Sequence, residues 1–257
     1  MIWAWVISFK YHLAYSRSSV RAVPAAFLAA TLITPLIGGS VVGRVELQDS
    51  PIASVRKHHD YSGVVIWLLP ASGTRRSVVG GKHATLLQRE KTFTPHMLAI
   101  QTGTTVDFPN YDPIFHNAFS NFSGQLFDIG LYAPGSSKSV RFQRAGAVRI
   151  FCNIHPAMSA VILVVDTPSF TVTRRDGEFE IANVTPGEYQ VKVFDERASE
   201  SVLKALESEV TVGDGNSTLP PMQISESGYL PASHKNKYGK DYPQTVDDTV
   251  FYPSSGK

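Results

Sequence analysis

The residues from 148 to 165, VRIFCNIHPAMSAVILVV, constrain the fold of this chain more than any other stretch. Two apolar runs of strand length flank a short segment in which Cys152, His155 and Met158 follow one another at intervals of three. Cys152 is the only cysteine among the 257 residues, so an internal disulfide is excluded. The pattern predicts two neighbouring strands joined by a loop that presents a thiol, an imidazole and a thioether together.

A second histidine, His116, lies upstream in the segment FPNYDPIFHNAFS. One thiolate, two imidazoles and a thioether are a poor set for structural zinc, because such sites use four strong nitrogen or sulfur ligands. They match the blue-copper set, in which two His and one Cys form a trigonal plane and a Met is a weak axial ligand. The alternative is that Cys152 and Met158 are core residues and that backbone carbonyls satisfy the histidines.

The overall composition is that of a packed globular protein. Apolar residues make up 43% of the chain and aromatic residues 11%, which argues against disorder. A formal net charge of +2 gives no reason to expect a nucleic-acid partner or an anionic membrane surface. The length allows one large or two small domains. No nucleotide fingerprint, phosphate loop or helical metal motif occurs in the sequence.

The first forty residues have the composition of an export signal. Their formal charges are three basic residues, Lys10, Arg17 and Arg21. An uncharged apolar run follows, AVPAAFLAATLITPLIGGS, and its small final residues predict cleavage near Gly39 or Ser40. An uncleaved membrane anchor is the alternative, because the uncharged run from 22 to 43 is about long enough to span a bilayer. We therefore expect residues 1–40 to be a signal peptide or an anchor and the protein to be exported to the periplasm.

From residue 41 onward, short apolar or alternating runs bounded by Gly, Pro, Ser and Asp predict strands. No stretch before residue 166 has a helical period with caps, so the expected fold class is all-β, built as sandwiches. The segment 199–206 is expected to be a turn of helix or a loop before a strand. The tail, residues 225–257, is rich in Ser, Pro, Lys and Asp. We expect it to be irregular, either wrapped over the domains or mobile.

The two histidine-containing segments together resemble the cupredoxins, the small blue copper proteins of the plastocyanin, pseudoazurin and amicyanin group. The Cys-x-x-His-x-x-Met spacing of FCNIHPAM, with Pro after the His, is similar to that of amicyanin. The resemblance covers about residues 82–165 and implies a cupredoxin Greek-key β-sandwich at residues 80–166. It also implies one type 1 copper per chain, with His116, Cys152 and His155 as equatorial ligands and Met158 as the axial ligand.

The same resemblance assigns roles around the metal. Asn117 corresponds to an asparagine that ties the two ligand loops together, whereas the usual Ser or Thr after the cysteine is Asn153 here. An apolar patch for docking of a redox partner would surround the edge of His155, formed by Pro113, Ile114, Pro156 and Ala157. His58 and His59, in the charged stretch VRKHHDYSG, are expected to be solvated loop residues, and His83, His96 and His234 are expected to have no metal role. The segment HKNKYGKDY near the tail is expected to be a solvated surface, with docking to an acidic partner as the alternative.

A second resemblance covers residues 170–196, FTVTRRDGEFEIANVTPGEYQVKVFDE, in which Arg-Asp-Gly between two alternating runs predicts a tight hairpin. The segment resembles the second half of transthyretin-like domains related to the carboxypeptidase regulatory domain. The matching residues are Asp176, Gly177, Phe179, Ile181, Pro186, Gly187, Tyr189 and Val191. The Gly-x-Val strand and apolar second strand that normally open such a domain occur upstream, between 43 and 69.

We therefore hypothesise a split sandwich. Strands from residues 41–79 would complete a transthyretin-like β-sandwich at 167–224, with the cupredoxin domain inserted between the two parts. The alternative is an N-terminal strand pair that only extends the copper domain.

These residues lead to one expected function and three alternatives. The expected function is a periplasmic carrier of single electrons, not an enzyme, between a dehydrogenase and a cytochrome c or an oxidase. Copper storage, delivery or sensing without redox cycling is the first alternative. Chemistry at an open copper position is the second, if Met158 does not coordinate. A structural or carbohydrate-binding surface protein is the third.

Overall fold

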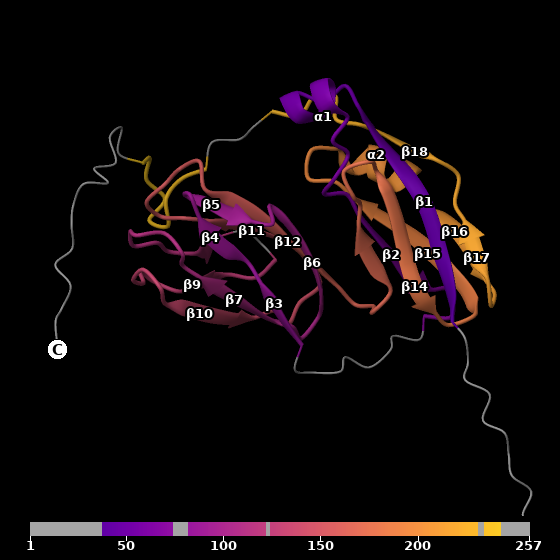
Figure 1. Cartoon of the computed structure of the whole chain (residues 1–257), viewed down its shortest axis with the longest axis horizontal. Helices are drawn as coiled ribbons and strands as arrows, with labels where there is room; N and C mark the ends of the chain where they lie inside the picture. Colours follow the sequence, from indigo (N-terminus) through magenta and orange to yellow (C-terminus); the bar gives the residue numbers. More distant parts are fainter. Residues whose placement is uncertain (1–37, 74–81, 122–123, 231–233, 243–257) are drawn as a thin grey trace, which may run out of the picture. The chain divides into compact units, whose positions relative to one another are not determined.

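The computed structural model describes residues 38–73, 82–121, 124–230 and 234–242 (Figure 1). Nearly all of the expected export signal lies outside the described residues. The described residues belong to one compact unit, and their regular structure consists mainly of strands. The predicted all-β fold class is therefore confirmed. None of the helices in this part of the chain is both long enough and apolar enough to cross a membrane.

The chain between residues 82 and 165 forms a first β-sandwich. Its strands in chain order are β3 (His83–Thr85), β4 (Leu87–Arg89), β5 (Thr92–Thr94), β6 (Met97–Gln101), β7 (Thr105–Pro109), β8 (Phe119–Ser120), β9 (Phe127–Asp128), β10 (Ser137–Arg141), β11 (Gly146–Phe151) and β12 (Ser159–Val165). One sheet has the order β6-β12-β11-β8-β9 and another the order β10-β7-β3, while β4 and β5 pair with each other. Strands β11 and β12 are antiparallel neighbours, as the sequence predicts.

The alternation of side chains along β11 determines what enters the core of this sandwich. Val148 and Ile150 are fully buried, and Cys152, one residue beyond the strand, continues the same row and is also fully buried. On β12 the inward row is formed by Ala160, Ile162 and Val164. The thiol of Cys152 therefore lies at the end of an inward-facing row of apolar side chains.

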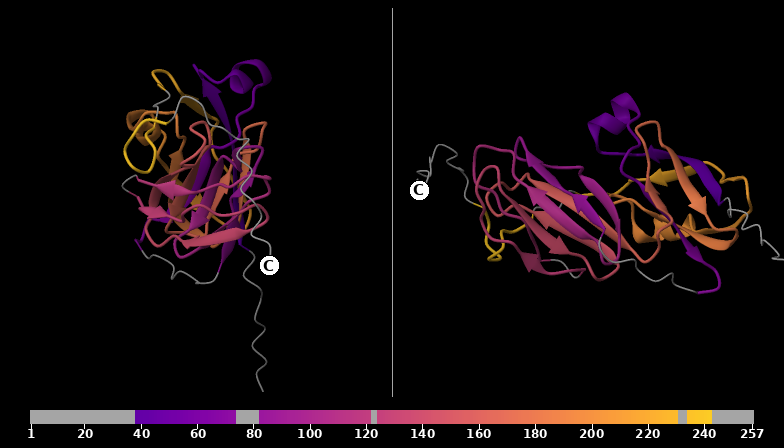
Figure 2. Two further views of the ribbon diagram at one scale, coloured as in Figure 1. Left: turned by 90° about the vertical axis from the view of Figure 1, so that its left-hand side faces the viewer. Right: turned by 60° about the horizontal axis from the view of Figure 1, so that its bottom comes forward.

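Residues from both ends of the described chain form a second β-sandwich. Its strands are β1 (Gly39–Gln48), β2 (Val65–Pro70), β13 (Phe170–Val172), β14 (Glu178–Val184), β15 (Gly187–Phe194), β16 (Ser208–Val212), β17 (Asn216–Thr218) and β18 (Met222–Ser225). One sheet has the order β14-β1-β17, with β18 also paired to β1, and the other has the order β13-β2-β15-β16. Figures 1 and 2 show the indigo strand β1 among the orange and yellow strands.

The pairing partners of β1 and β2 bear on the split-sandwich hypothesis. Strand β1 pairs with β14 through Gly43 and Phe179, and β2 pairs with both β13 and β15. These are the pairings that the hypothesis requires, and none of them involves a strand of the first sandwich. Gly39 and Ser40, where we expect cleavage of the export signal, already belong to β1. Cleavage there would remove the first residues of this strand.

Two short helices accompany the second sandwich. Helix α1 (Ala53–His58) was not expected, and it contains His58, which we had placed in a loop. The helix is only six residues long and buries a single side chain, Val55, so its sequence carries no apolar period. Helix α2 (Glu200–Ala205) is the expected turn of helix, and the hydroxyl of Ser199 accepts a hydrogen bond from the backbone N–H of Val202 at its start.

The expected turn at residues 174–177 is present, but it does not close a hairpin. The backbone N–H of Gly177 donates to the carbonyl of Arg174 over 2.9 Å, and the φ angle of Gly177 is +80°. The strand before the turn, β13, pairs with β2, whereas the strand after it, β14, pairs with β1. The turn therefore passes the chain from one sheet of the second sandwich to the other.

A third apolar cluster contains residues from both sandwiches. The buried members come from β2, β6 and β12 and are Val65, Met97, Val161, Leu163 and Val165. Val161, Leu163 and Val165 alternate along β12 with the residues of its inward row, so they lie on the opposite face of the strand. Strand β12 is thus buried on both faces, which explains its continuous apolar sequence.

We predict that Gly177→Ala destabilises the protein more than Gly228→Ala, although both glycines have a φ of +80°. The left-handed backbone costs an alanine about 1–2 kcal/mol at either position. At residue 177 an added Cβ would also lie 2.0 Å from the carbonyl oxygen of Val45, whereas nothing lies within 4 Å at residue 228. Denaturant unfolding should show a loss of about 3 kcal/mol or more for the first variant and about 1 kcal/mol for the second. Equal losses would contradict the close packing of this turn on β1.

Candidate metal centre

Three buried side chains meet beyond the end of β11. The Sγ atom of Cys152 is 3.8 Å from Nδ1 of His116 and 3.8 Å from Nδ1 of His155. The three ligand atoms all lie within 4.8 Å of one another, and the two imidazole rings have centroids 5.0 Å apart. His116 and Cys152 are inaccessible to solvent, and His155 is 6% exposed. No other group of His, Cys, Asp and Glu side chains in the described ranges is gathered in this way.

These distances fit a trigonal metal site. With metal bonds of about 2.3 Å to sulfur and about 2.0 Å to nitrogen, trigonal-planar geometry separates the sulfur from each nitrogen by about 3.7 Å. The two observed separations between Sγ and Nδ1 are both 3.8 Å. Two imidazoles and one thiolate are also the equatorial donors of blue-copper sites. The side chains present therefore fit copper in both spacing and donor type.

The loop between β11 and β12 folds tightly around its ligands. The backbone N–H of Cys152 donates to the carbonyl of Met158 over 3.1 Å, and the N–H of Met158 donates to the carbonyl of His155 over 3.0 Å. Met158 is fully buried and belongs to the same apolar cluster as Cys152. This position is compatible with both readings of the residue, as an axial ligand and as a core side chain, so its coordination stays a prediction.

His116 is fixed on both its backbone and its ring. Its backbone N–H and carbonyl bond to the carbonyl and N–H of Tyr132 over 3.3 and 2.9 Å. Its ring Nε2 lies 2.7 Å from Oδ2 of Asp112. Because a carboxylate only accepts, Nε2 is the donor in this bond, and Nδ1 is the ring nitrogen that faces Cys152. A carboxylate on the outer nitrogen of a metal-binding histidine is a frequent arrangement.

Asp112 was not identified from the sequence. It also accepts the backbone N–H groups of Glu90 and Lys91, over 2.6 and 2.9 Å. Burial by itself would raise the pKa of Asp112, but the hydrogen bonds from Lys91, His116 and Glu90 outweigh it and lower the pKa. The carboxylate is therefore ionised at neutral pH. The only sequence signal for its role was its position four residues before His116. The two backbone N–H groups that hold its carboxylate come from a turn about twenty residues earlier in the chain, which the sequence does not connect with this site.

The surroundings of Cys152 favour the thiolate. Burial would raise the pKa of the thiol, but hydrogen bonds with His116, His155 and the backbone N–H groups of Ile154 and His155 lower it to about 6. The thiolate is the form that binds metals. The structure therefore presents Cys152 in its ligating state near neutral pH.

The two asparagines link the segments that carry the ligands. The side-chain carbonyl of Asn117 accepts the backbone N–H of Asn153 over 3.2 Å, and its amide donates to Asp128 over 2.7 Å. Asn117 thus bridges the two segments, as the family resemblance implied. The side chain of Asn153 has a different partner, since its Oδ1 accepts the backbone N–H of Lys237 over 2.9 Å.

The residues assigned to a docking patch differ in exposure. Pro113, Pro156 and Ala157 are exposed, whereas Ile114 is half-buried and its carbonyl accepts the amide of Asn110 over 2.8 Å. The side chain of His155, which these residues are expected to surround, reaches the surface only slightly. Their use as a docking patch stays a prediction.

The segment HKNKYGKDY differs most from its expected role. Lys235 and Lys240 are exposed, as a solvated surface requires. The ring of His234, however, stacks on Phe151 with centroids 3.9 Å apart, and the hydroxyl of Tyr242 donates to the backbone carbonyl of Cys152 over 2.8 Å. The composition of the segment predicted a solvated surface. It gives no sign of these contacts, because their partners are largely backbone atoms.

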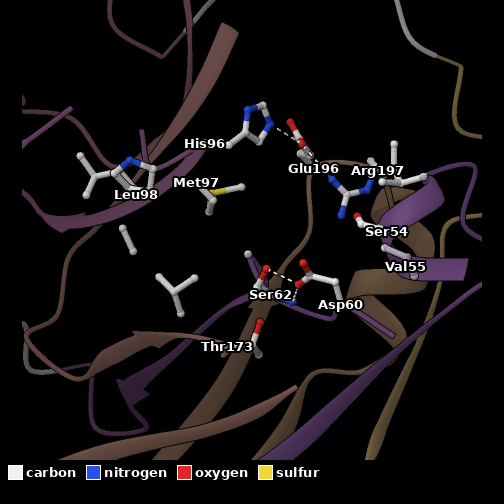
Figure 3. A pocket seen from close by; sticks show the side chains of 15 residues that line it. Ser54, Val55, Asp60, Ser62, His96, Met97, Leu98, Thr173, Glu196 and Arg197 are labelled. Atoms are coloured by element: carbon white, nitrogen blue, oxygen red, sulfur yellow. Dashed lines mark hydrogen bonds and ion pairs between the residues drawn. The ribbon is translucent and has the colours of Figure 1, made fainter. Parts of the chain in front are cut away.

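A separate hollow of about 530 Å³ is lined by charged and apolar side chains of both sandwiches (Figure 3). None of the four expected metal ligands lines it. Its polar groups bind one another: Nε2 of His96 lies 2.6 Å from Glu196, which is 3.0 Å from Arg197, and Ser62 donates to Asp60 over 2.6 Å. The hollow is therefore distinct from the metal centre.

No protein-family model and no curated protein matches this chain. Matching solved structures include a purple cupredoxin from Nitrosopumilus maritimus, with 24% identity over 33% of this chain and 100% of that one, at a TM-score of 0.30. A copper-containing nitrite reductase from Thermus scotoductus has 26% identity over 37% of this chain and 26% of its own, at 0.32. A Cu(I) form of an amicyanin variant has 20% identity over 32% of this chain and 82% of its own, at a TM-score of 0.31. The assignment of the site rests on its own distances and donors.

We predict that Asp112→Asn weakens copper binding about ten- to hundredfold, because the carboxylate orients His116 and makes Nδ1 more basic. The matched control is Asp107→Asn, which removes a carboxylate that bonds His83 and Ser139 outside the cluster. Competition with a chromophoric Cu(I) chelator measures both affinities. Equal affinities for the two variants would remove Asp112 from the metal site.

The pair formed by His96 and Glu196 predicts a pH-dependent contribution to stability. The hydrogen bond with Glu196 raises the pKa of His96 above its ordinary value of 6.5. This contribution is therefore complete below pH 6.5 and is lost as the pH rises through the raised pKa. Wild type should exceed His96→Gln in unfolding free energy at about pH 6, by less than about 1 kcal/mol since His96 is half exposed, and the difference should shrink at about pH 9. Glu196→Gln should abolish the same pH dependence, and a pH-independent difference would contradict the assignment.

Proposed function

We propose that this protein binds one copper ion through His116, Cys152 and His155, with Met158 as a weak axial ligand, and that it carries single electrons. The observation that carries the proposal is the pair of equal distances from the buried Cys152 sulfur to two imidazole nitrogens. Copper supplies a one-electron couple between Cu(I) and Cu(II) when it is bound at such a site. The thiolate and thioether suit Cu(I), and the imidazoles suit both oxidation states.

The protein's part in electron transfer is to hold the ligands still. Asp112 and the backbone of Tyr132 fix His116, and the hydrogen bonds within the loop fix Cys152 and Met158. Burial keeps water away from the donor atoms. Ligands that are held in one arrangement need little movement when the charge of the site changes, which keeps the cost of electron transfer small.

Burial also favours a carrier over an enzyme. Of the three clustered ligands, two are inaccessible and His155 is 6% exposed, so a substrate has little access to the donor atoms. An electron needs no open position, and His155 is the one of these three ligands that reaches the surface. We propose that a redox partner docks on Pro113, Ile114, Pro156 and Ala157, with a dehydrogenase as donor and a cytochrome c or oxidase as acceptor.

We further propose that the second sandwich is a transthyretin-like module that serves as a spacer or a binding platform, with carbohydrate as a candidate ligand. The support is the order of pairing, in which β1 pairs with the strand that carries the matching residues Phe179 and Ile181, and β2 pairs with the strand that carries Tyr189. Export to the periplasm is proposed on the composition of residues 1–40.

The proposal predicts a visible spectrum. A chain beginning at Gly38, which keeps β1 whole, should gain an intense thiolate-to-copper absorption band when Cu(II) is added, and ascorbate should bleach it reversibly. Cys152→Ala should abolish the band, whereas His83→Gln, which alters a histidine outside the cluster, should leave it unchanged. Met158→Leu should shift the band if the thioether coordinates.

Each other result of this experiment identifies a different function. A band that ascorbate bleaches irreversibly, with retained Cu(I), indicates copper storage or delivery. A weak band with exchangeable solvent at the copper indicates chemistry at an open position. Absence of any band, with copper removed by mild chelation, would overturn the proposal and leave the sandwiches as a binding module.

A further inference from the structure

The segment from His234 to Tyr242, which we call the strap, lies against the loop that carries Cys152 and His155. It is the yellow segment beside the first sandwich in Figures 1 and 2. Its two ends meet, because the ring of Tyr242 packs edge-on against His234 at 5.2 Å and its hydroxyl lies 3.2 Å from Nδ1 of that residue. Within the strap, the side chain of Asn236 accepts the backbone N–H groups of Tyr238 and Lys240. The strap is therefore a closed turn with an internal structure of its own.

Three hydrogen bonds join the strap to the ligand loop. The hydroxyl of Tyr242 donates to the carbonyl of Cys152 over 2.8 Å. Nε2 of His234 lies 2.8 Å from the carbonyl of Pro156, the residue after His155. The backbone N–H of Lys237 donates to the side chain of Asn153 over 2.9 Å. The bonded loop residues thus begin at one expected ligand and end directly after the other.

Two more contacts extend this attachment. The ring of His234 stacks on Phe151, the last residue of β11, with an angle of 24° between the planes. The ammonium group of Lys237 lies 2.8 Å from Asp128, whose other oxygen accepts the amide of Asn117. Through Asp128 the strap is therefore connected to the residue that follows His116, in the second ligand-bearing segment.

The ligand loop needs such partners because it lies outside the sheet. Beyond Phe151 the ladder between β11 and β12 has ended, so the carbonyls of Cys152 and Pro156 have no strand partner. A loop held at both its carbonyls and its side chains has fewer accessible arrangements than one held only at its ends. The hydroxyl of Tyr242 is the donor in its bond to the loop, because the carbonyl oxygen of Cys152 only accepts.

We propose that the strap is a positioning element of the metal centre, in which Tyr242 and His234 hold the backbone of the ligand loop so that Cys152 and His155 keep their separation. The inference rests on the proposed function and deepens it. Neither residue coordinates the metal in this proposal. Each acts through the backbone beside an expected ligand, and the preorganised loop releases copper slowly and keeps one geometry in both oxidation states.

The test uses single substitutions in the full chain. Tyr242→Phe removes the bond to Cys152 and keeps the ring. His234→Phe keeps an aromatic ring over Phe151 but removes the bond to Pro156, and His234→Ala removes both. Tyr238→Phe is the matched control, because it removes a hydroxyl from the same strap on a side chain that is 70% exposed.

We expect the transfer of Cu(I) to a chromophoric chelator to be about two- to tenfold faster in Tyr242→Phe, the range that corresponds to one lost hydrogen bond. The combined variant His234→Ala with Tyr242→Phe should be faster still, with a shifted thiolate-to-copper band and a changed reduction potential. Tyr238→Phe should match wild type in all three quantities. A combined variant that loses unfolding free energy but keeps the wild-type release rate, band and potential would overturn the proposal.

Amide hydrogen exchange on the metal-free protein separates this inference from the copper assignment. The backbone amides of residues 153–155 should exchange faster in the combined variant than in wild type or in Tyr238→Phe. If wild type shows no thiolate-to-copper band, the proposed function fails, while faster exchange in the variant still shows that the strap orders this loop. Unchanged exchange overturns the strap's positioning role whatever the metal result.

Discussion

The structure depends on keeping one thiol between two imidazoles in a place that water does not reach. Cys152 achieves this because it extends the inward row of β11 by one residue, at the point where the strand has ended. The preceding side chain of this row, Ile150, packs in the apolar core. The imidazoles offset the cost of burying a thiolate there by hydrogen bonding, so the same contacts that gather the ligands also stabilise the charged sulfur.

Such a site needs a rigid frame on both sides of its loop. Strand β12 supplies one side, and it is buried on both faces: one row of its side chains packs in the first core, and the other row packs against Met97 and Val65. Because Val65 belongs to β2, the second sandwich contributes to the environment of the strand that follows the ligand loop. The second sandwich therefore packs against the outward face of the strand that leads away from the ligand loop.

The sequence predicted the features that depend on local spacing. The positions of Cys152 and His155 relative to two apolar strands, and the bridging amide of Asn117, follow from short patterns. The pairing of the strand containing Gly43 with the strand containing Phe179 could be predicted because each of the two segments carries a recognisable motif. Asp112 was not predictable, since its backbone donors, Glu90 and Lys91, both adopt positive φ in a turn that no pattern specifies. Helix α1 and the parallel strands β17 and β18 are too short for a periodic signal.

The strap shows most clearly why composition fails to identify such a role. Lys235 and Lys240 face solvent, which gives the segment its hydrophilic composition. The groups that bind the loop are one imidazole, one phenol and one backbone amide. Their partners are mainly carbonyl oxygens, which every residue has, and so no complementary sequence is needed on the loop. The exposed side chains of Pro156 and Ala157 do not take part in these bonds. The strap can therefore hold the backbone of the ligand loop while the proposed docking residues stay accessible, and rigidity of the site and access for a partner become separate properties of one loop.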